Sequence, residues 1–221
     1  MPMIRWEKVS SRSLDVMTKE LREFNLIVAG VGGQGSVLAS HIVADVAVTQ
    51  GMKTRVGDTF GAAQRGGKVH SHVRIGEDVY SPLCPEESLD VLLGLEPNET
   101  IRLAVRYAGP KTFIVMNTRP VPSIDVNIGA DKYPPVEEIV EGLKKLSEMV
   151  IAFDATELAI QSGNQRTMNV VLLGALASTD RLPYEAEALK EGIREHVPPR
   201  TIDANLKAFS LGWARASALI L

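Results

Sequence analysis

Residues 25–35 read Asn-Leu-Ile-Val-Ala-Gly-Val-Gly-Gly-Gln-Gly, and this stretch decides the fold class of the chain. The apolar run 25–29 is rich in β-forming residues and ends at a glycine cluster, which predicts a buried first strand. Residues 36–49 then mix apolar and small side chains between two glycines, which predicts a buried helix. A strand that passes through a glycine loop into a helix is the opening unit of an α/β fold.

The rest of the chain continues this alternation. Further strands are predicted at residues 53–56, 69–75, 89–93, 112–116 and 149–153, and helices at 97–108 and 135–148. Gly76-Glu77-Asp78 is a turn signal, which predicts that residues 70–75 fold back onto residues 79–81 as a hairpin.

The last part of the chain has a helical pattern throughout. Residues 167–178 are apolar on every face, residues 183–196 are amphipathic, and apolar residues recur at helical spacing from Ile202 to Trp213. The predicted fold class is therefore α/β, with three α/β/α layers, a largely parallel Rossmann-like sheet, an added β-hairpin and a helical C-terminal region.

Composition and charge exclude several classes of function. The 221 residues carry 24 Lys and Arg against 27 Asp and Glu, a net charge of −3, so no broad basic field favours nucleic acid or a membrane surface. Residues 1–24 lack the apolar run of a secretion signal, and the apolar stretch 167–179 is shorter than the roughly 20 residues that span a bilayer. We expect a cytoplasmic protein with an N-terminal arm, 1–24, and a single domain, 25–221.

The only cysteine of the chain is Cys84. One thiol cannot form an internal disulfide, a cysteine-ligated zinc site or an iron–sulfur cluster, because each needs several ligands. Electron-carrying clusters are therefore not expected in this chain.

The glycine loop is the first candidate binding site. Its G-x-G-x-x-G pattern, between a predicted strand and a predicted helix, suits an anion at a helix N-terminus, and the candidate residues are Gly30, Gly32, Gly33, Gln34, Gly35 and Ser36. Asp58 follows at the distance of a ribose-binding acid, which alone suggests NAD or FAD. Gly33 is an extra glycine, however, and residues 57–61 look like a loop. The alternative, that the glycines only permit a tight turn, also stays open.

A second loop, residues 61–68, places Arg65 and Lys68 around Gly66 and Gly67. Flexible backbone with two cations suits an anion or a partner's carboxylate, and an exposed basic turn is the alternative. Arg65, Gly66 and Gly67 therefore join the candidate cofactor-binding residues.

The histidines form no catalytic or metal-binding set, and no catalytic residue is assigned. We expect His41 to pack in the apolar face of the first helix. His70 and His72 should share one sheet face, as a packed or partner-facing pair. His196 lies at a helix end, where a positive charge is favourable.

A series of motifs then follows in fixed order along the chain. The series consists of the loop 30–35, Gln64-Arg-Gly-Gly67 leading into His72-Val-Arg-Ile75, Leu89-Asp-Val-Leu-Leu-Gly-Leu-Glu96, Asn117, Tyr133-Pro-Pro135, Asp154-Ala155 and Asn169-Val-Val-Leu-Leu-Gly-Ala175. From about residue 25 to about residue 214 the chain resembles the gamma-type domain of the 2-oxoacid:ferredoxin oxidoreductases, most closely the beta subunits of indolepyruvate ferredoxin oxidoreductases.

The resemblance implies a subunit of a thiamine-diphosphate enzyme that decarboxylates an indolepyruvate or arylpyruvate to acyl-CoA, CO2 and reduced ferredoxin. No thiamine-diphosphate signature is found in this chain, so that cofactor, magnesium and the iron–sulfur clusters are expected on a larger alpha subunit, in a heterotetramer. This chain would not be catalytic alone. Its two glycine loops would bind the phosphates of coenzyme A or a partner subunit.

Several alternatives remain open at this point. The oxoacid could be pyruvate, 2-oxoglutarate or a branched-chain acid. The chain could also be a stand-alone nucleotide-binding oxidoreductase or an architectural subunit without a ligand. The apolar segment 167–178 could be a core helix or a helix that a partner covers.

Overall fold

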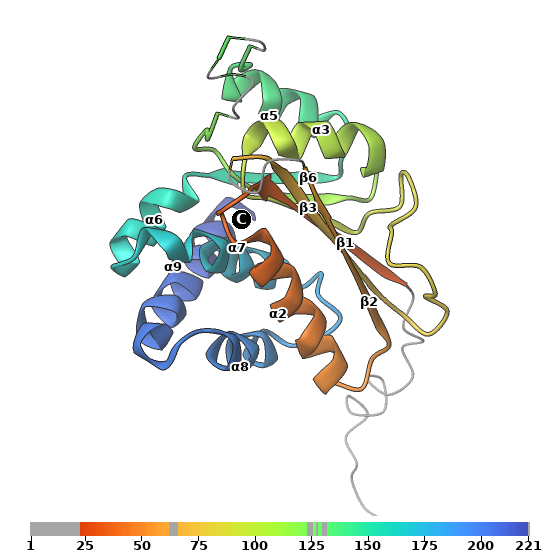
Figure 1. The fold of residues 1–221 in the computed structure, drawn as a ribbon, viewed down its shortest axis with the longest axis vertical. Helices are drawn as coiled ribbons and strands as arrows, with labels where there is room; N and C mark the ends of the chain where they lie inside the picture. The colour runs from red at the N-terminus through yellow and green to blue at the C-terminus, as the bar shows by residue number, and fades with distance from the viewer. Residues whose placement is uncertain (1–22, 62–65, 123–125, 127, 130–131, 221) are drawn as a thin grey trace, which may run out of the picture.

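The computed structural model describes residues 23–61, 66–122, 126, 128–129 and 132–220, and Figure 1 shows a twisted sheet between two layers of helices. The strand order is β2-β3-β1-β4-β5-β6. The strands are β1 (Phe24–Val31), β2 (Thr54–Phe60), β3 (Lys68–Ile75), β4 (Val91–Gly94), β5 (Phe113–Asn117) and β6 (Met149–Phe153). Strands β1, β4, β5 and β6 are parallel, whereas β3 runs antiparallel to both β1 and β2. The predicted fold class is confirmed.

Helices cover both faces of the sheet. One face carries α2 (Ser36–Thr49), α6 (Ala155–Ser162), α7 (Met168–Ala177), α8 (Ala186–His196) and α9 (Ile202–Ile220), and the other carries α3 (Pro97–Tyr107) and α5 (Val136–Lys144). Two short 3₁₀ turns, η1 (Gln165–Thr167) and η2 (Pro199–Thr201), precede α7 and α9. Alternate residues of the buried β1 supply the two cores: Leu26 packs with α2 and α7, and Ile27 packs with α3.

The predicted hairpin between residues 70–75 and 79–81 is wrong. Strand β3 pairs with β1 on one side and with β2 on the other, so both of its edges are occupied. The guanidinium of Arg74 donates to the carbonyl oxygens of Ser81 and Leu83, so this segment crosses the face of β3 instead of pairing beside it. The hairpin of the fold is β2–β3, and β2 includes Gly57–Phe60, which the sequence pattern indicated as loop.

Helix α7 is the central helix of the larger core, and all ten of its residues are buried. Its closest neighbour is α9. A Cβ added at Gly174 would lie 2.0 Å from the carbonyl oxygen of Phe209, and one at Gly212 would lie 1.8 Å from that of Val171. The two helices therefore touch backbone to backbone. The apolar segment 167–178 is a core helix of this chain, and the interpretation that a partner covers it is wrong.

Two expectations concern the chain termini and membranes. Most of the predicted N-terminal arm lies outside the described residues, and β1 begins at Phe24, one residue earlier than the sequence predicts. Within the described residues, none of the helices combines the length and apolar character that crossing a bilayer demands.

Candidate functional site

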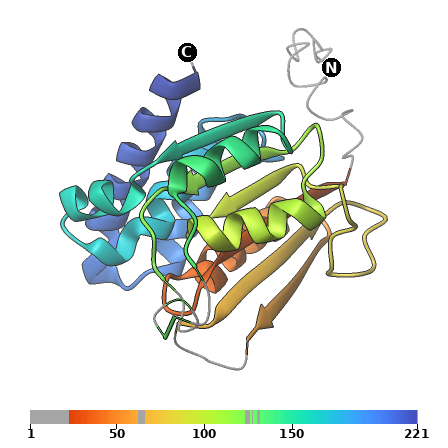
Figure 2. The same cartoon turned by 90° about the horizontal axis from the view of Figure 1, so that it is seen from above.

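The sheet has a topological switch point between β1 and β4. The helix after β1, α2, lies on one face, and the helix after β4, α3, lies on the other. Chain segments therefore diverge at the carboxyl ends of these two strands, which is where open α/β sheets bind ligands. Figure 2, seen from above, shows α3 in front of the sheet and α2 behind it. The glycine loop and Glu96 lie at this point.

The glycine loop forms the start of α2. Gly33 and Gly35 have φ angles of 103° and 82°, a region that favours glycine. Gly35 is the N-cap residue, and among the described residues no side chain caps the helix there. The N–H groups of the first turn have no intrahelical acceptor, so this end of α2 carries partial positive charge without an acidic residue to offset it.

The two predicted glycine loops lie against each other. The Gly32 N–H donates to the Gly67 carbonyl oxygen at 2.8 Å, and the Gly66 N–H donates to the Gly32 carbonyl oxygen at 3.3 Å. Arg65, the remaining candidate of the second loop, lies outside the described residues. The structure thus brings the described candidates together, but the Gly32 N–H is already engaged within the protein.

The side chain of Gln34 forms hydrogen bonds to both chain segments at the switch point. Its side-chain Oε1 accepts from the Val31 N–H at 2.8 Å, and its Nε2 donates to the Leu95 carbonyl oxygen at 3.2 Å. A Cβ at Gly30 would lie 2.8 Å from Gln34 Oε1, so the glycine makes room for this side chain. The amide therefore joins the ends of β1 and β4.

Asp58 does not occupy a ribose-binding position. It lies in β2, which β3 separates from β1, whereas a ribose-binding acid stands at the end of the strand next to β1. Its carboxylate accepts from the Ser71 hydroxyl at 2.5 Å and lies 3.2 Å from His41 Nε2. These contacts argue against NAD or FAD at this loop. The expected packing of His41 is wrong, because its side chain is 46% exposed.

Glu96 is a buried carboxyl group. It belongs to one of the motifs of the family resemblance, but the sequence pattern assigns it no role. Its Oε2 accepts from the Glu99 N–H at 2.9 Å and so caps α3. Its Oε1 accepts from the hydroxyl of Tyr133 at 2.5 Å and from the Val121 N–H at 3.4 Å. Burial raises the pKa of Glu96, although these hydrogen bonds oppose the increase. Glu96 thus holds both ends of the β5–α5 connection at the carboxyl edge.

Two buried asparagines complete the edge. Asn117 donates through Nδ2 to the Leu95 carbonyl oxygen at 3.2 Å and accepts through Oδ1 from the Ala155 N–H at 3.0 Å. Asn169, at the start of α7, donates through Nδ2 to the Gly35 carbonyl oxygen at 3.2 Å. Both residues belong to motifs of the family resemblance, which was the only sequence signal for them.

His70 and His72 form a packed pair, which is one of the two arrangements expected from the sequence. The rings of His70 and His72 are 5.3 Å apart on the same sheet face, and His72 also contacts Tyr107. His72 Nδ1 accepts from the Cys84 N–H at 3.1 Å, and burial lowers the pKa of His72 to about 4. Across the described part of the chain, no three histidine, cysteine or carboxylate side chains gather as metal ligands would.

The comparisons with known proteins agree on one family. The family described as pyruvate ferredoxin/flavodoxin oxidoreductase matches residues 25–215. The chain is 41% identical over 201 residues to indolepyruvate oxidoreductase subunit IorB of Pyrococcus horikoshii, which covers 90% of this chain and 99% of the relative.

Two solved structures share the fold. The gamma subunit of a keto/oxoacid ferredoxin oxidoreductase from Geobacter sulfurreducens has a TM-score of 0.64 at 22% identity, over 88% of this chain and 99% of that chain. The 2-oxoglutarate:ferredoxin oxidoreductase from Magnetococcus marinus, with 2-oxoglutarate, coenzyme A and succinyl-CoA bound, has a TM-score of 0.65 at 24% identity, over 90% of this chain and 32% of that chain.

Proposed function

This chain belongs to the pyruvate ferredoxin/flavodoxin oxidoreductase family, and we propose that it is the beta, gamma-type subunit of an indolepyruvate or arylpyruvate:ferredoxin oxidoreductase. It is the small subunit of an oxidoreductase and is not catalytic alone. The complete cytoplasmic enzyme would convert a 2-oxoacid to acyl-CoA and CO2 and reduce ferredoxin. The 41% identity to an indolepyruvate oxidoreductase subunit, over nearly the full length of both chains, supports this oxoacid class.

The cofactors of this reaction divide between two chains in our proposal. Iron–sulfur clusters do not fit here, because the single thiol, Cys84, is buried and burial raises its pKa to about 12. We assign the clusters, thiamine diphosphate and magnesium to a larger alpha subunit that pairs with this chain in a heterotetramer.

Coenzyme A fits the described residues of the carboxyl edge. The observation that carries this assignment is the uncapped N-terminus of α2 at the switch point between β1 and β4. The backbone at Gly33, Gly35 and Ser36 would hold a phosphate group through N–H donors, and Arg65 would add a charged contact. The coenzyme would supply the thiol that accepts the acyl group. Gln34, Gly66 and Gly67 would keep the loop in shape for it.

The test compares two glycines with nearly the same φ angle. Gly33 and Gly163 have φ angles of 103° and 101°, and a Cβ at either position meets no atom within 4 Å. Alanine at each site therefore carries similar backbone strain, but only Gly33 lies in the anion loop. In the assembled enzyme, Gly33→Ala should raise the KM for CoA roughly tenfold or more, the value for a weakened hydrogen bond to a charged group.

The assay is arylpyruvate-dependent reduction of a viologen dye by the two subunits together, with Gly163→Ala as the control. Turnover by this chain alone would refute the proposed division of labour. Equal CoA KM values for the two variants would refute the phosphate assignment and leave the loop as a structural turn.

A further inference from the structure

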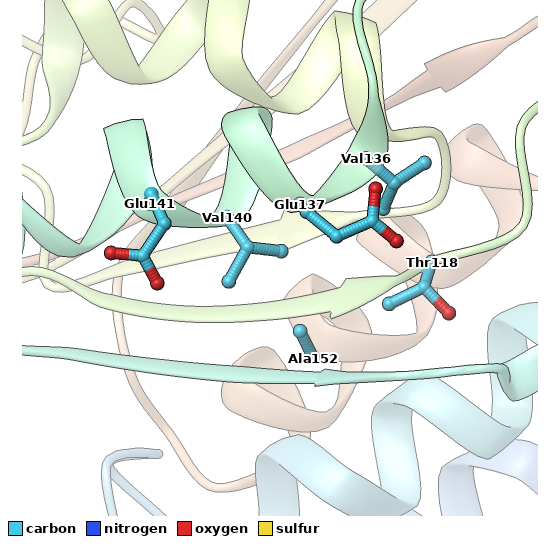
Figure 3. Close-up of a pocket in the computed structure, with 6 residues that line it drawn as sticks. All are labelled: Thr118, Val136, Glu137, Val140, Glu141 and Ala152. Carbon is cyan, nitrogen blue, oxygen red and sulfur yellow. The ribbon is translucent and has the colours of Figure 1, made fainter.

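A groove lies at the β6 edge of the sheet, between β6 and α5 (Figure 3). Its volume is about 400 Å³, and it is lined by Thr118, Val136, Glu137, Val140, Glu141 and Ala152. In Figure 3 the side chains of Glu137, Val140 and Glu141 extend from α5 toward the sheet, and Ala152 points toward them from β6. None of these residues takes part in the coenzyme A assignment.

The backbone of β6 is open along this groove. β6 pairs with β5 on one side, and no strand among residues 23–61, 66–122 and 132–220 pairs with its other side. The Thr118 N–H donates to the Phe153 carbonyl oxygen at 3.0 Å, so that carbonyl points toward β5. Because backbone groups alternate in direction along a strand, those of Val150 and Ala152 point outward. They form a ready template for another strand.

The helix above the edge provides an apolar surface for such a strand. α5 buries Ile139 and Leu143 against the smaller core, and Val136 and Val140 on the same helix line the groove and are only half-buried. Ala152 is also half-buried. An extended segment placed beside β6 would cover these apolar side chains and gain main-chain hydrogen bonds at the same time.

The charges at the groove select the kind of segment. Glu141 pairs with Lys144 at 2.7 Å, whereas Glu137 has no cation within ion-pair distance among the described residues. The nearby Arg119 is held by Asp154 at 2.7 Å. A second copy of this chain, paired edge to edge, would oppose carboxylates with carboxylates, so the charge disfavours self-association and favours a basic segment.

We propose that the outer edge of β6 docks the larger oxidoreductase subunit, which adds an extended segment bearing lysine or arginine as a seventh strand. The main chain of the segment bonds to Val150 and Ala152, and its cations lie beside Glu137 and Glu141. This inference rests on the proposed function, because it takes the larger subunit of the same enzyme as the partner.

Proline substitution at Ala152 tests the docking strand. The Ala152 N–H points away from β5, and proline is tolerated at edge positions whose N–H faces outward, so Ala152→Pro removes one donor from the docking edge. Ala152→Ser is the matched control, because it keeps the N–H and nearly the same size. Ala152→Pro should weaken binding of the purified larger subunit about tenfold, while Ala152→Ser binds like the wild type.

Two further measurements make the test specific. Hydrogen exchange in the wild-type complex should slow at the amides of Val150 and Ala152. Replacing Glu137 and Glu141 by lysine should weaken binding and reverse its dependence on salt, because salt screens the new repulsion between like charges.

The outcomes are distinguishable. If the wild-type chain does not bind the larger subunit at all, both the proposed function and this inference are overturned. If the complex forms but the β6 amides stay unprotected and a folded Ala152→Pro variant binds normally, only the docking site is wrong. A wild-type homodimer that Ala152→Pro dissociates would assign this edge to a second copy instead.

Discussion

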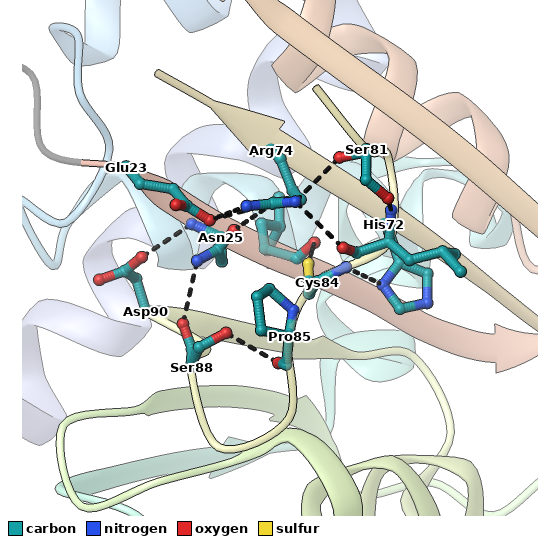
Figure 4. Close-up of polar contacts among 11 residues, drawn as sticks. Glu23, Asn25, His72, Arg74, Ser81, Cys84, Pro85, Ser88 and Asp90 are labelled. Atoms are coloured by element: carbon teal, nitrogen blue, oxygen red, sulfur yellow. Dashed lines mark hydrogen bonds and ion pairs between the residues drawn. The ribbon is translucent and has the colours of Figure 1, made fainter. Parts of the chain in front are cut away.

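Replacing Arg74 by methionine should destabilise the fold more than any other single change of an arginine on β2 or β3. Arg74 is 8% exposed and donates to the side chain of Asn25 at 3.0 Å and to the carbonyl oxygens of Ser81 and Leu83 at 3.0 and 3.2 Å. It also pairs with Glu23. Figure 4 shows these partners converging on the guanidinium from β1, from the segment before it and from the connection after β3.

The magnitude follows from what the substitution leaves behind. Methionine keeps most of the apolar stem and removes every donor, so three neutral acceptors and the Glu23 carboxylate lose a charged partner. A buried acceptor left unpaired costs about 1–3 kcal/mol. Glu23 is 40% exposed, so it regains water and adds little. Because the segment around Ser81 can also move toward water, we expect a total of about 2–4 kcal/mol.

The control is Arg55, the residue directly across from Arg74 on β2. Its side chain is exposed and donates to the carbonyl oxygen of the preceding Thr54, so Arg55→Met should change stability by no more than about 0.5 kcal/mol. Urea unfolding followed by circular dichroism gives both values. A loss below about 1 kcal/mol for Arg74→Met, or equal losses for the two variants, would show that this network does not hold the 81–83 segment on β3.

Two other predictions concern helix packing and pH. Gly212→Ala places a Cβ 1.8 Å from the Val171 carbonyl oxygen and should cost at least about 2 kcal/mol of stability. In Gly142→Ala the nearest atom to the new Cβ is 3.4 Å away, so this variant should stabilise α5 by up to about 1 kcal/mol. Thermal unfolding of both variants checks this, and an equal response of the two would contradict it. Burial lowers the pKa of His196, but its hydrogen bonds to Asp45 and to the Gly192 carbonyl oxygen outweigh burial and raise that pKa overall. The stabilisation of the fold by protonated His196 should therefore be full below about pH 6.5 and disappear as pH rises through the folded-state pKa. The difference in unfolding free energy between wild type and His196→Gln should shrink over that window, and a difference that grows with pH would contradict the assignment.

The parts of the fold that the sequence predicts correctly are those with local signals. The first strand, the glycine loop and α2 follow one another within residues 24–49, and glycines mark the end of the strand and both ends of the helix. The hairpin prediction failed although Gly76 does end β3, because a local turn says nothing about which strand pairs with which. The pairing of β3 with β1 joins residues 24–31 to residues 68–75 and depends on both segments together.

The candidate site shows the same limit. Its glycines could be found because the G-x-G-x-x-G pattern is local, but the roles of Gln34 and Asn169 could not. Gln34 reaches a carbonyl oxygen 61 residues away in sequence, and Asn169 reaches one 134 residues away. Side-chain amides of this kind have many possible partners, and only the folded chain selects among them.

The burial of α7 by its own chain also changes where a partner subunit can bind. Since α9 already covers that helix, the apolar segment 167–178 cannot be the contact, and an open surface must serve instead. A short series of hydrogen bonds connects the β6 edge to the candidate coenzyme site. Asn117 accepts a hydrogen bond from the N–H of Ala155, which follows β6. It donates to the Leu95 carbonyl oxygen, to which Gln34 also donates. A partner strand on β6 would therefore lie a few hydrogen bonds from the glycine loop, so assembly and coenzyme binding would use the same end of one sheet.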